Sequence, residues 1–262
     1  MNIIVCIKQV PDTTEVRLDP VTGTLIRQGV PSIINPDDKA GLEAALRLKD
    51  QYGAHVTVLT MGPPQADIAL REALAMGADE AVLITDRAFG GADTWATSST
   101  LASAIQKFDY DLIITGRQAI DGDTAQVGPQ IAEHLGIVNI SYAEELELEL
   151  EGGTIKVKRQ YEDRSHSIRA KLPCLITALS ELNEPRYMTP GGIFDACREG
   201  EIKLLSRADL QIDDENIGLK GSPTRVYRSF TKAVKGKGSV VTLNAQESAD
   251  WLVEKLQEKF IL

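Results

Sequence analysis

Short apolar runs that alternate with helical patterns constrain the fold of this chain more than any other sequence feature. The runs are rich in β-branched residues and stop at turn residues, as buried parallel strands do; they cover residues 3–7, 55–60, 81–85 and 112–115. A helical pattern follows each run, marked by Leu42, Ala45 and Leu46, by Leu70, Ala73 and Leu74, by Leu101, Ala104 and Ile105, and by Val127, Ile131 and Leu135. This alternation predicts an α/β fold, with a parallel sheet covered by helices on both faces.

The ends of the predicted strands indicate where a ligand would bind. In open parallel sheets, ligands lie beyond the carboxyl ends of the strands. The chain leaves those ends through residues 6–9, 60–62, 86–94 and 116–126. We therefore expect these four segments to converge on one crevice.

The loop after the fourth run has the composition of a phosphate site. Gly116 ends the strand, and a loop leads from it into a helix. Backbone N–H groups at such a loop and helix start point at one spot, and Gly122 and Gly128 allow a bulky anion to approach closely. A nucleotide phosphate is the natural ligand, with backbone N–H groups, Thr124 and Gln126 as its expected contacts.

A purely structural role for the same loop stays open at this point. Asp121, Asp123 and Thr124 are good helix N-caps, and most strand-to-helix loops with such residues bind no ligand. Two carboxylates beside a pyrophosphate would also repel it. We therefore expect Asp121 and Asp123 to cap the helix or to face a ribose hydroxyl.

Composition excludes several classes of partner and site. The 28 Lys and Arg residues against 38 Asp and Glu residues give a net charge of -10, which argues against nucleic acid and anionic membrane as partners. The three cysteines lie far apart without a Cys-x-x-Cys, so we expect no disulfide framework and no metal site. The sequence shows neither a secretory leader nor a transmembrane segment, and we expect a cytoplasmic location.

Catalytic motifs are missing from the sequence. It has no Gly-x-Gly-x-x-Gly after the first strand, no P-loop and no Ser-Gly-Gly-x-Asp-Ser loop. The three histidines have no spacing that would pair them with a nucleophile or an acid. Any catalysis must therefore belong to a bound cofactor.

The pattern changes after residue 140. Leucines alternate with glutamates, two glycines follow, and Ile155 and Val157 alternate with lysines, which predicts a β-hairpin over residues 144–160. Another strand is expected at 172–179. We assign residues 1–190 to a nucleotide-binding α/β domain that includes the hairpin, and residues 191–262 to an extended arm that ends in a helix and docks on a partner.

Five motifs give the whole chain a resemblance to the β subunits of electron-transfer flavoproteins. They lie at residues 8–12 (Lys-Gln-Val-Pro-Asp), 35–36 (Asn-Pro), 73–79 (Ala-Leu-Ala-Met-Gly-Ala-Asp), 116–128 and 182–187 (Leu-Asn-Glu-Pro-Arg-Tyr). The resemblance implies a fold like that of the adenine-nucleotide α-hydrolases. It also implies a heterodimer with an α subunit that carries one FAD, and an adenine nucleotide bound by the β subunit beyond its sheet.

Two branches of this family differ in that nucleotide. In one branch the β subunit holds AMP as a structural ligand, and the dimer carries electrons from acyl-CoA dehydrogenases. In the electron-bifurcating branch it holds a second FAD, which takes hydride from NADH. One electron then goes to ferredoxin or flavodoxin, and the other goes through the α-subunit FAD to an acyl-CoA dehydrogenase-type partner.

Three departures from the AMP-binding pattern favour the bifurcating branch. Residues 121–126 read Asp-Gly-Asp-Thr-Ala-Gln, without the three successive acids and the Asn of AMP binders. Residues 89–97 resemble the loop of bifurcating members, in which Thr94 and Thr97 would bond an FAD. Residues 35–38 read Asn-Pro-Asp-Asp, whereas this stretch ends in an apolar or cysteine residue in AMP binders. Structural AMP stays the alternative. A free-standing nucleotide sensor of the same fold is a third reading, and the long arm argues against it because such an arm suggests a partner.

The resemblance carries over a set of expected site residues, with the flavin as the reactive centre and neither a catalytic side chain nor a metal. The expected cofactor-binding residues are Cys6, Lys8, Asn35, Asp38, Thr60, Met61, Gly62, Thr94, Thr97, Gly116, Arg117, Gln118, Asp121, Gly122, Asp123, Thr124, Ala125, Gln126, Val127 and Gly128. The family's dehydrogenase-recognition loop corresponds to the stretch after Tyr187. Pro190 replaces its usual leucine anchor, so Ile193 or Phe194 is expected to serve instead.

Overall fold

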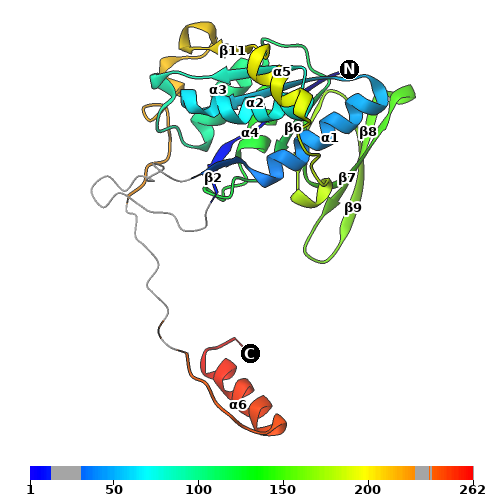
Figure 1. Cartoon of the computed structure of the whole chain (residues 1–262). Helices are drawn as coiled ribbons and strands as arrows, with labels where there is room; N and C mark the ends of the chain where they lie inside the picture. Colours follow the sequence, from blue (N-terminus) through cyan, green and yellow to red (C-terminus); the bar gives the residue numbers. More distant parts are fainter. Residues whose placement is uncertain (13–30, 228–235, 237, 262) are drawn as a thin grey trace. The chain divides into compact units, whose positions relative to one another are not determined.

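A computed structural model describes residues 1–12, 31–227, 236 and 238–261 of the chain. These residues form two compact units, residues 1–225 and residues 226–262 (Figure 1). The first unit contains the sheet and the candidate site. The second contains one helix among its described residues.

The first unit is built on a sheet in which, within the described residues, nine strands follow the order β11-β5-β4-β1-β6-β10-β7-β8-β9. Pairing is parallel from β11 to β7 and antiparallel from β7 to β9. The strands are β1 (Asn2–Cys6), β4 (His55–Met61), β5 (Glu80–Ile84), β6 (Leu112–Gly116), β7 (Val138–Glu149), β8 (Thr154–Gln160), β9 (Ser165–Lys171), β10 (Cys174–Ala178) and β11 (Ile202–Leu205). A separate pair joins β2 (Gln9–Pro11) and β3 (Ser32–Ile34).

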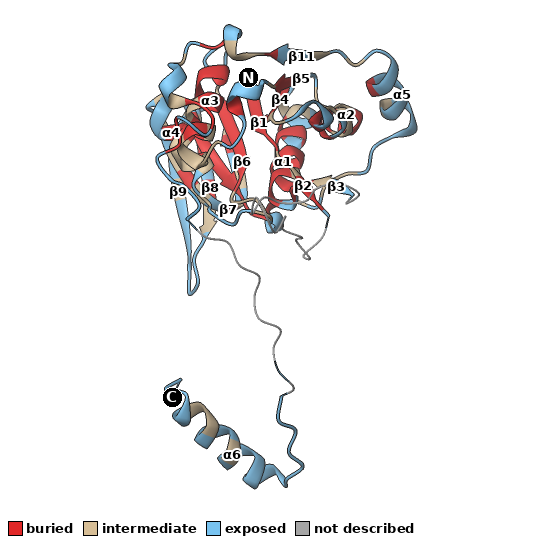
Figure 2. Cartoon of the chain, turned by 90° about the vertical axis from the view of Figure 1, so that its left-hand side faces the viewer, coloured by how far each residue is buried: buried red, intermediate tan, exposed pale blue. Residues whose placement is uncertain are grey.

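Helices cover both faces of the parallel part of this sheet, as predicted. The α-helices are α1 (Pro36–Tyr52), α2 (Asp67–Met76), α3 (Thr94–Ile105), α4 (Val127–Leu135), α5 (Pro190–Arg198) and, in the second unit, α6 (Ala245–Glu258). Short 3-10 turns lie at η1 (Pro64–Ala66), η2 (Arg87–Phe89), η3 (Leu150–Gly152), η4 (Ser180–Leu182), η5 (Arg207–Asp209) and η6 (Asp214–Asn216). One apolar cluster packs α1 and α2 on Ile3 and Val5, and another packs α3 and α4 on Ile4 (Figure 2).

The first helix shows how local sequence sets the ends of these elements. Asn35 precedes α1 and Pro36 opens it, where the missing N–H of proline is harmless. Asp37 and Asp38 follow in the first turn, where the helix dipole favours carboxylates. The helix ends at Gly53, whose φ of 67° lies in the left-handed region that glycine adopts without strain.

The predicted hairpin is confirmed and extended by a third strand. β7 pairs with β8, and acids face lysines on the exposed side, as at Glu147 and Lys156. β9 continues the sheet by pairing with β8. The sequence does not predict β9, because only Ile168 and Ala170 interrupt its polar character.

The first unit continues past the predicted boundary at residue 190 and ends at Arg225. α5 begins at Pro190 and is capped by Thr189, whose hydroxyl accepts the N–H of Gly192 at 3.0 Å. β11 then pairs with β5 at the edge of the sheet. Of the predicted arm, only residues 226–262 form the second unit, and residues 228–235, 237 and 262 lie outside the described residues.

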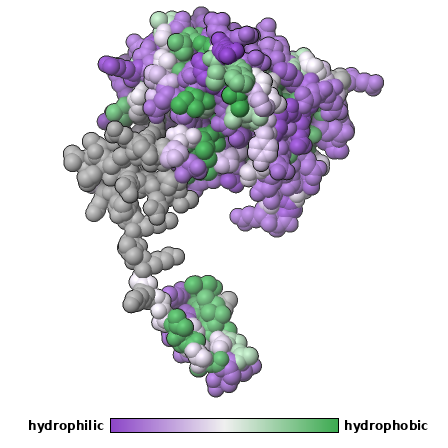
Figure 3. Space-filling view, viewed as in Figure 1, coloured by the Kyte–Doolittle hydropathy of each residue, from purple (hydrophilic) through white to green (hydrophobic). Residues whose placement is uncertain are grey.

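The helix predicted at the end of the chain is confirmed as α6. It starts at a capping box in which the Asn244 side chain accepts the N–H of Glu247 at 2.9 Å. Leu252 and Val253 are exposed on it, and Figure 3 shows hydrophobic residues gathered on the surface of this unit. No helix in the described parts of the chain is long and apolar enough to cross a membrane.

Candidate functional site

The carboxyl ends of β1, β4, β5 and β6 converge on a cavity of about 1160 Å³. The cavity therefore lies where the sheet topology predicted it. The predicted residues that line it are Cys6, Lys8, Asp38, Met61, Gly62, Thr94, Thr97, Gly116, Arg117, Gln118, Gly122, Thr124, Ala125, Gln126, Val127 and Gly128. Their contact with a ligand stays a prediction.

Two predicted contacts, Asn35 and Thr60, do not line this cavity. Both side chains are buried and occupied by backbone groups. The Asn35 amide donates to the carbonyl of Gln118 at 2.8 Å and accepts the N–H of Ile120 at 3.0 Å. Thr60 donates to the carbonyl of Ile7 at 2.8 Å. These hydrogen bonds hold the backbone of the loops around the cavity. The Asn35 side chain is used in this way and does not cap α1.

Asp121 and Asp123 also lie outside the lining, and neither caps α4. Asp121 forms an ion pair with Lys8, with 2.5 Å between Oδ1 and Nζ. Asp123 accepts a hydrogen bond from the Gln118 side chain. Both carboxylates are therefore bound by side chains of the protein, Asp121 by Lys8 and Asp123 by Gln118.

The loop leaves a run of backbone donors beside the cavity. Asp123 and Ala125 have φ values of 55° and 52°, which place them in the left-handed region and turn successive peptide groups toward one another. Among residues 1–12 and 31–227, the N–H groups of residues 124–128 have no acceptor. The first turn of α4 begins in this run, so these donors and the helix dipole favour an anion here.

Residues 86–93, which we call the wall loop, form another part of the cavity wall, and all of them except Ala88 line the cavity. Arg87 and Phe89 of this loop line the cavity, and sequence reasoning did not single them out. Their position directly after a predicted strand was the available signal. Thr94 follows the loop at the start of α3, and its hydroxyl donates to Gln126 Oε1 at 2.8 Å. This bond joins the start of α3, directly after the wall loop, to the loop of residues 116–126.

Two buried acidic groups lie at the base of the cavity. Asp38 accepts the N–H groups of Lys8 at 2.7 Å and Gly116 at 3.0 Å. Burial nevertheless raises the pKa of Asp38 to about 7. Burial and the charge of Asp38 raise the pKa of the Cys6 thiol to about 12. The Cys6 thiol is therefore held in its neutral form at neutral pH.

The cavity is large enough for a nucleotide cofactor. Its volume exceeds the roughly 300–1,000 Å³ of most small-molecule sites. A Cβ atom added at Gly122 would meet nothing within 4 Å, so this glycine leaves open space beside the backbone donors. No group of His, Cys, Asp and Glu residues in the described part of the chain could hold a metal ion. The volume of the cavity and the backbone donors beside it support binding of a nucleotide.

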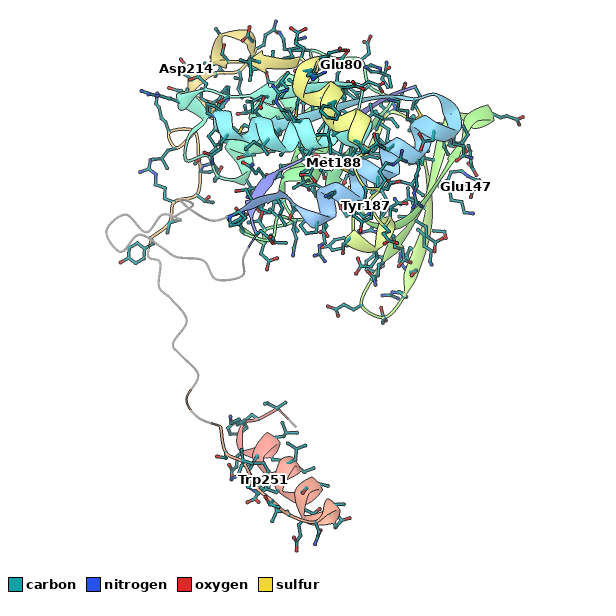
Figure 4. The ribbon with its side chains drawn as sticks, viewed as in Figure 1. Glu80, Glu147, Tyr187, Met188, Asp214 and Trp251 are labelled. Atoms are coloured by element: carbon teal, nitrogen blue, oxygen red, sulfur yellow. The ribbon has the colours of Figure 1, made fainter. Side chains whose placement is uncertain are left out.

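The predicted partner-recognition residues lie on the surface around the start of α5. Tyr187 is 95% exposed and Phe194 is 60% exposed, and Ile193 and Pro190 are also exposed. Figure 4 shows Tyr187 and Met188 on the stretch that leads into α5. Arg186 anchors this stretch to α1 through Glu43, with 2.8 Å between Nε and Oε2. These residues are available to a partner, and recognition itself stays a prediction.

Comparison with known proteins identifies the family. The model of the electron transfer flavoprotein domain matches residues 22–210. Electron transfer flavoprotein subunit beta of Clostridium acetobutylicum is 61% identical over 259 residues, which cover 99% of each chain. Caffeyl-CoA reductase-Etf complex subunit CarD of Acetobacterium woodii is 55% identical over 265 residues, and acryloyl-CoA reductase electron transfer subunit gamma of Anaerotignum propionicum is 47% identical over 271 residues, with 100% of each chain covered in both cases. The chain belongs to the electron transfer flavoprotein family, among its β subunits.

Proposed function

We propose that this β subunit binds FAD in the cavity and takes part in electron bifurcation. As a member of its family it pairs with an α subunit to form a heterodimer. The volume of the cavity, about 1160 Å³, is the observation that carries the FAD assignment. Such a space is larger than AMP alone requires, and the bare backbone at Gly122 widens it further.

The residues of the cavity have distinct proposed roles. The N–H groups of residues 124–128 and the start of α4 hold the pyrophosphate. Thr94 and Thr97 contribute hydroxyls from the first turn of α3. Asp38 fixes the floor by holding the backbone of Lys8 and Gly116. The protein thereby supplies position and electrostatic environment, which is its usual share in flavin chemistry.

When bound, FAD supplies the redox chemistry: it takes hydride from NADH, and the two electrons go separately to ferredoxin or flavodoxin and, through the α-subunit FAD, to an acyl-CoA dehydrogenase-type partner. Two relatives support that partner class, because their names place them with caffeyl-CoA reductase and acryloyl-CoA reductase. NADH and ferredoxin are reactants of the cytoplasm, so we assign the complex to that compartment. The second unit, residues 226–262, is proposed to dock on the α subunit through the exposed apolar residues of α6.

Nucleotide content of the purified heterodimer tests the proposal. The chain is co-expressed with its α subunit, the complex is denatured, and the released nucleotides are separated by chromatography and counted per dimer. Two FAD and no AMP are expected. One FAD and one AMP would contradict the proposal and leave the chain a structural nucleotide binder.

Reduction by NADH gives a second, independent test. NADH alone should reduce the flavin of the heterodimer before any dehydrogenase is added. Gly122→Ala provides a control that should be reduced like wild type, because its small side chain enters open space. A complex that holds two FAD and stays oxidised under excess NADH would retain the cofactor assignment and refute the NADH-dependent role.

A further inference from the structure

Residues 217–224, which we call the strap, pack directly on the wall loop. The N–H of Leu219 donates to the carbonyl of Gly90 at 3.0 Å. Ile217 is 4% exposed and belongs to the same apolar cluster as Phe89, which is 5% exposed. The strap lies in the first unit and is followed at Val226 by the second. The strap is therefore packed against the residues that form the cavity, even though none of its own residues lines the cavity.

Asp93 joins the strap to α3. Its Oδ1 caps the helix by accepting the N–H of Ala96 at 3.0 Å. Its Oδ2 accepts both the N–H and the hydroxyl of Thr224, at 3.0 and 2.7 Å. Its own N–H donates to Ser222 Oγ at 2.8 Å, and that hydroxyl donates to the carbonyl of Gly218 at 2.8 Å. One aspartate thus connects the strap, the wall loop and the first turn of α3.

The strap and the wall loop approach so closely that their contact requires glycine. Gly218 has a φ of +56°, and a Cβ on it would lie 2.0 Å from the carbonyl oxygen of Ala88. Gly91 has a φ of +73°, and its Cβ would lie 3.1 Å from Leu219 Cβ. Both positions favour glycine for conformation as well as for space. A side chain at either position would push the two segments apart, so the contact depends on both glycines.

This contact bears on the cavity because the wall loop forms one of its sides. Asp93 and Thr94 line the cavity together, and Thr94 bonds Gln126 in the loop of residues 116–126. A displacement of Asp93 would move the start of α3 and would release the bond from Thr94. The geometry of the cavity thus depends on hydrogen bonds that originate in the strap.

We propose that the strap is a positioning element of the nucleotide site, with Thr224 and Ser222 acting through Asp93 to hold the wall loop and Thr94 in their binding geometry. The inference rests on the proposed nucleotide in the cavity, and it applies to FAD and to AMP alike. It assigns a role in ligand affinity to residues that do not touch the ligand. Because linkage is reciprocal, a bound nucleotide should also stabilise the strap.

Thr224→Val tests this role, because it removes the hydroxyl and keeps the backbone N–H. FAD and AMP are each titrated into the nucleotide-stripped heterodimer, and hydrogen exchange of residues 88–96 is followed by mass spectrometry. The Kd of the nucleotide that binds wild type should rise at least about 5-fold, the lower end of typical coupling between linked sites. Exchange in residues 88–96 should become faster. Ser222→Ala should act in the same direction.

Two further variants separate positioning from general stability. Thr224→Ser restores the hydroxyl and should return the Kd to the wild-type value. Thr154→Val removes a comparable hydroxyl-to-carboxylate bond, 2.7 Å to Glu149 Oε2, in the distant hairpin, and should leave the Kd unchanged. Wild-type affinity in both Thr224→Val and Ser222→Ala would overturn the role of the strap and would leave the proposed function standing. A wild-type heterodimer that binds neither nucleotide in this cavity would overturn the proposed function as well.

Discussion

Asp38 Oδ1 accepts the backbone N–H of Gly116 at 3.0 Å, and this bond fastens the start of α1 to the end of β6. The second oxygen of Asp38 accepts the N–H of Lys8, which lies just beyond β1. One carboxyl group therefore holds the ends of two neighbouring parallel strands at the floor of the cavity. A Cβ on Gly116 would lie 2.1 Å from the same Oδ1 atom, so the arrangement depends on glycine.

Gly116→Ala should destabilise the heterodimer because the added methyl group overlaps Asp38. Overpacking of this kind lowers the free energy of unfolding by about 1–3 kcal/mol, and the bond to the Gly116 N–H would be lost too. Chemical denaturation of the nucleotide-free complex measures the change. Gly122→Ala is the matched control and should unfold like wild type, since its Cβ meets no atom within 4 Å. Equal stability of Gly116→Ala, Gly122→Ala and wild type would show that the residues around Gly116 accommodate the added methyl group without cost.

Ionisation of Asp38 should make stability fall as the pH rises from about 4 toward 7. Burial raises the folded-state pKa of Asp38 to about 7, above the value of about 3.9 of an unfolded Asp. The folded state therefore binds the proton more tightly, and this contribution is complete below about pH 4 and lost as the pH rises through about 7. The difference in unfolding free energy between wild type and Asp38→Asn should change by up to about 1.4 kcal/mol per pH unit. A constant difference across this range would contradict the raised pKa.

The elements that surround the cavity were predictable because their sequences carry a strong period. Buried strands such as β6 are continuous apolar runs, and α4 repeats an apolar residue at 127, 131 and 135. β11 is an edge strand held by backbone pairing with β5, and its side chains are partly exposed. α5 contains Gly191 and Gly192, and Gly192 packs against the Ala75 carbonyl where a Cβ would lie 2.5 Å away. Tertiary contacts form these two elements, so local pattern could not predict them.

The location of the candidate site was predictable from the sequence, but the direction of its side chains was predictable only in part. Topology located the cavity, because parallel strands end on one edge of the sheet. The direction of individual side chains depends on neighbours distant in sequence. Asn35 reaches Gln118 and Ile120 from a distant part of the chain, and Asp93 reaches Thr224. Such partners become visible only once the fold brings them together.

Arg186→Met should destabilise the complex by about 3 kcal/mol, the low end for loss of one partner of a buried ion pair, because it leaves the buried Glu43 carboxylate without its main partner. Burial on its own would raise the pKa of Glu43, but hydrogen bonds from Arg186 hold this pKa below its ordinary value. Glu43 therefore stabilises the fold at neutral pH, and this contribution is lost as the pH falls through the folded-state pKa. Arg47→Met removes a more exposed partner of the same carboxylate and should change stability by less than about 1 kcal/mol. Urea denaturation measures the loss of stability in each variant. Similar losses in both would show that Arg186 is not the main partner of Glu43.

Phe194→Ala should slow electron transfer to the dehydrogenase partner by about tenfold without changing the nucleotide content. A loss of this size corresponds to roughly 1.4 kcal/mol, which an exposed aromatic anchor commonly contributes to an interface. Leu204→Ala truncates another exposed apolar residue, on β11, and should leave the rate unchanged. Stopped-flow reduction of the partner separates this effect from flavin loading. A wild-type rate in Phe194→Ala would place the recognition surface elsewhere.

Gly122→Glu should weaken the binding of FAD because it places a long acidic side chain in the open space beside the backbone donors. The N–H groups of residues 124–128 would then face a carboxylate of the protein itself, which competes with the pyrophosphate for the same donors. The steric part and the charge part are separable, since Gly122→Gln adds similar bulk without charge. We expect Gly122→Glu to lose most of its β-subunit FAD, Gly122→Gln to lose less, and Gly122→Ala to retain it. Released FAD per heterodimer is the readout, and the stability of each variant is measured without nucleotide. Wild-type FAD content in Gly122→Glu would mean that the pyrophosphate does not lie against this loop.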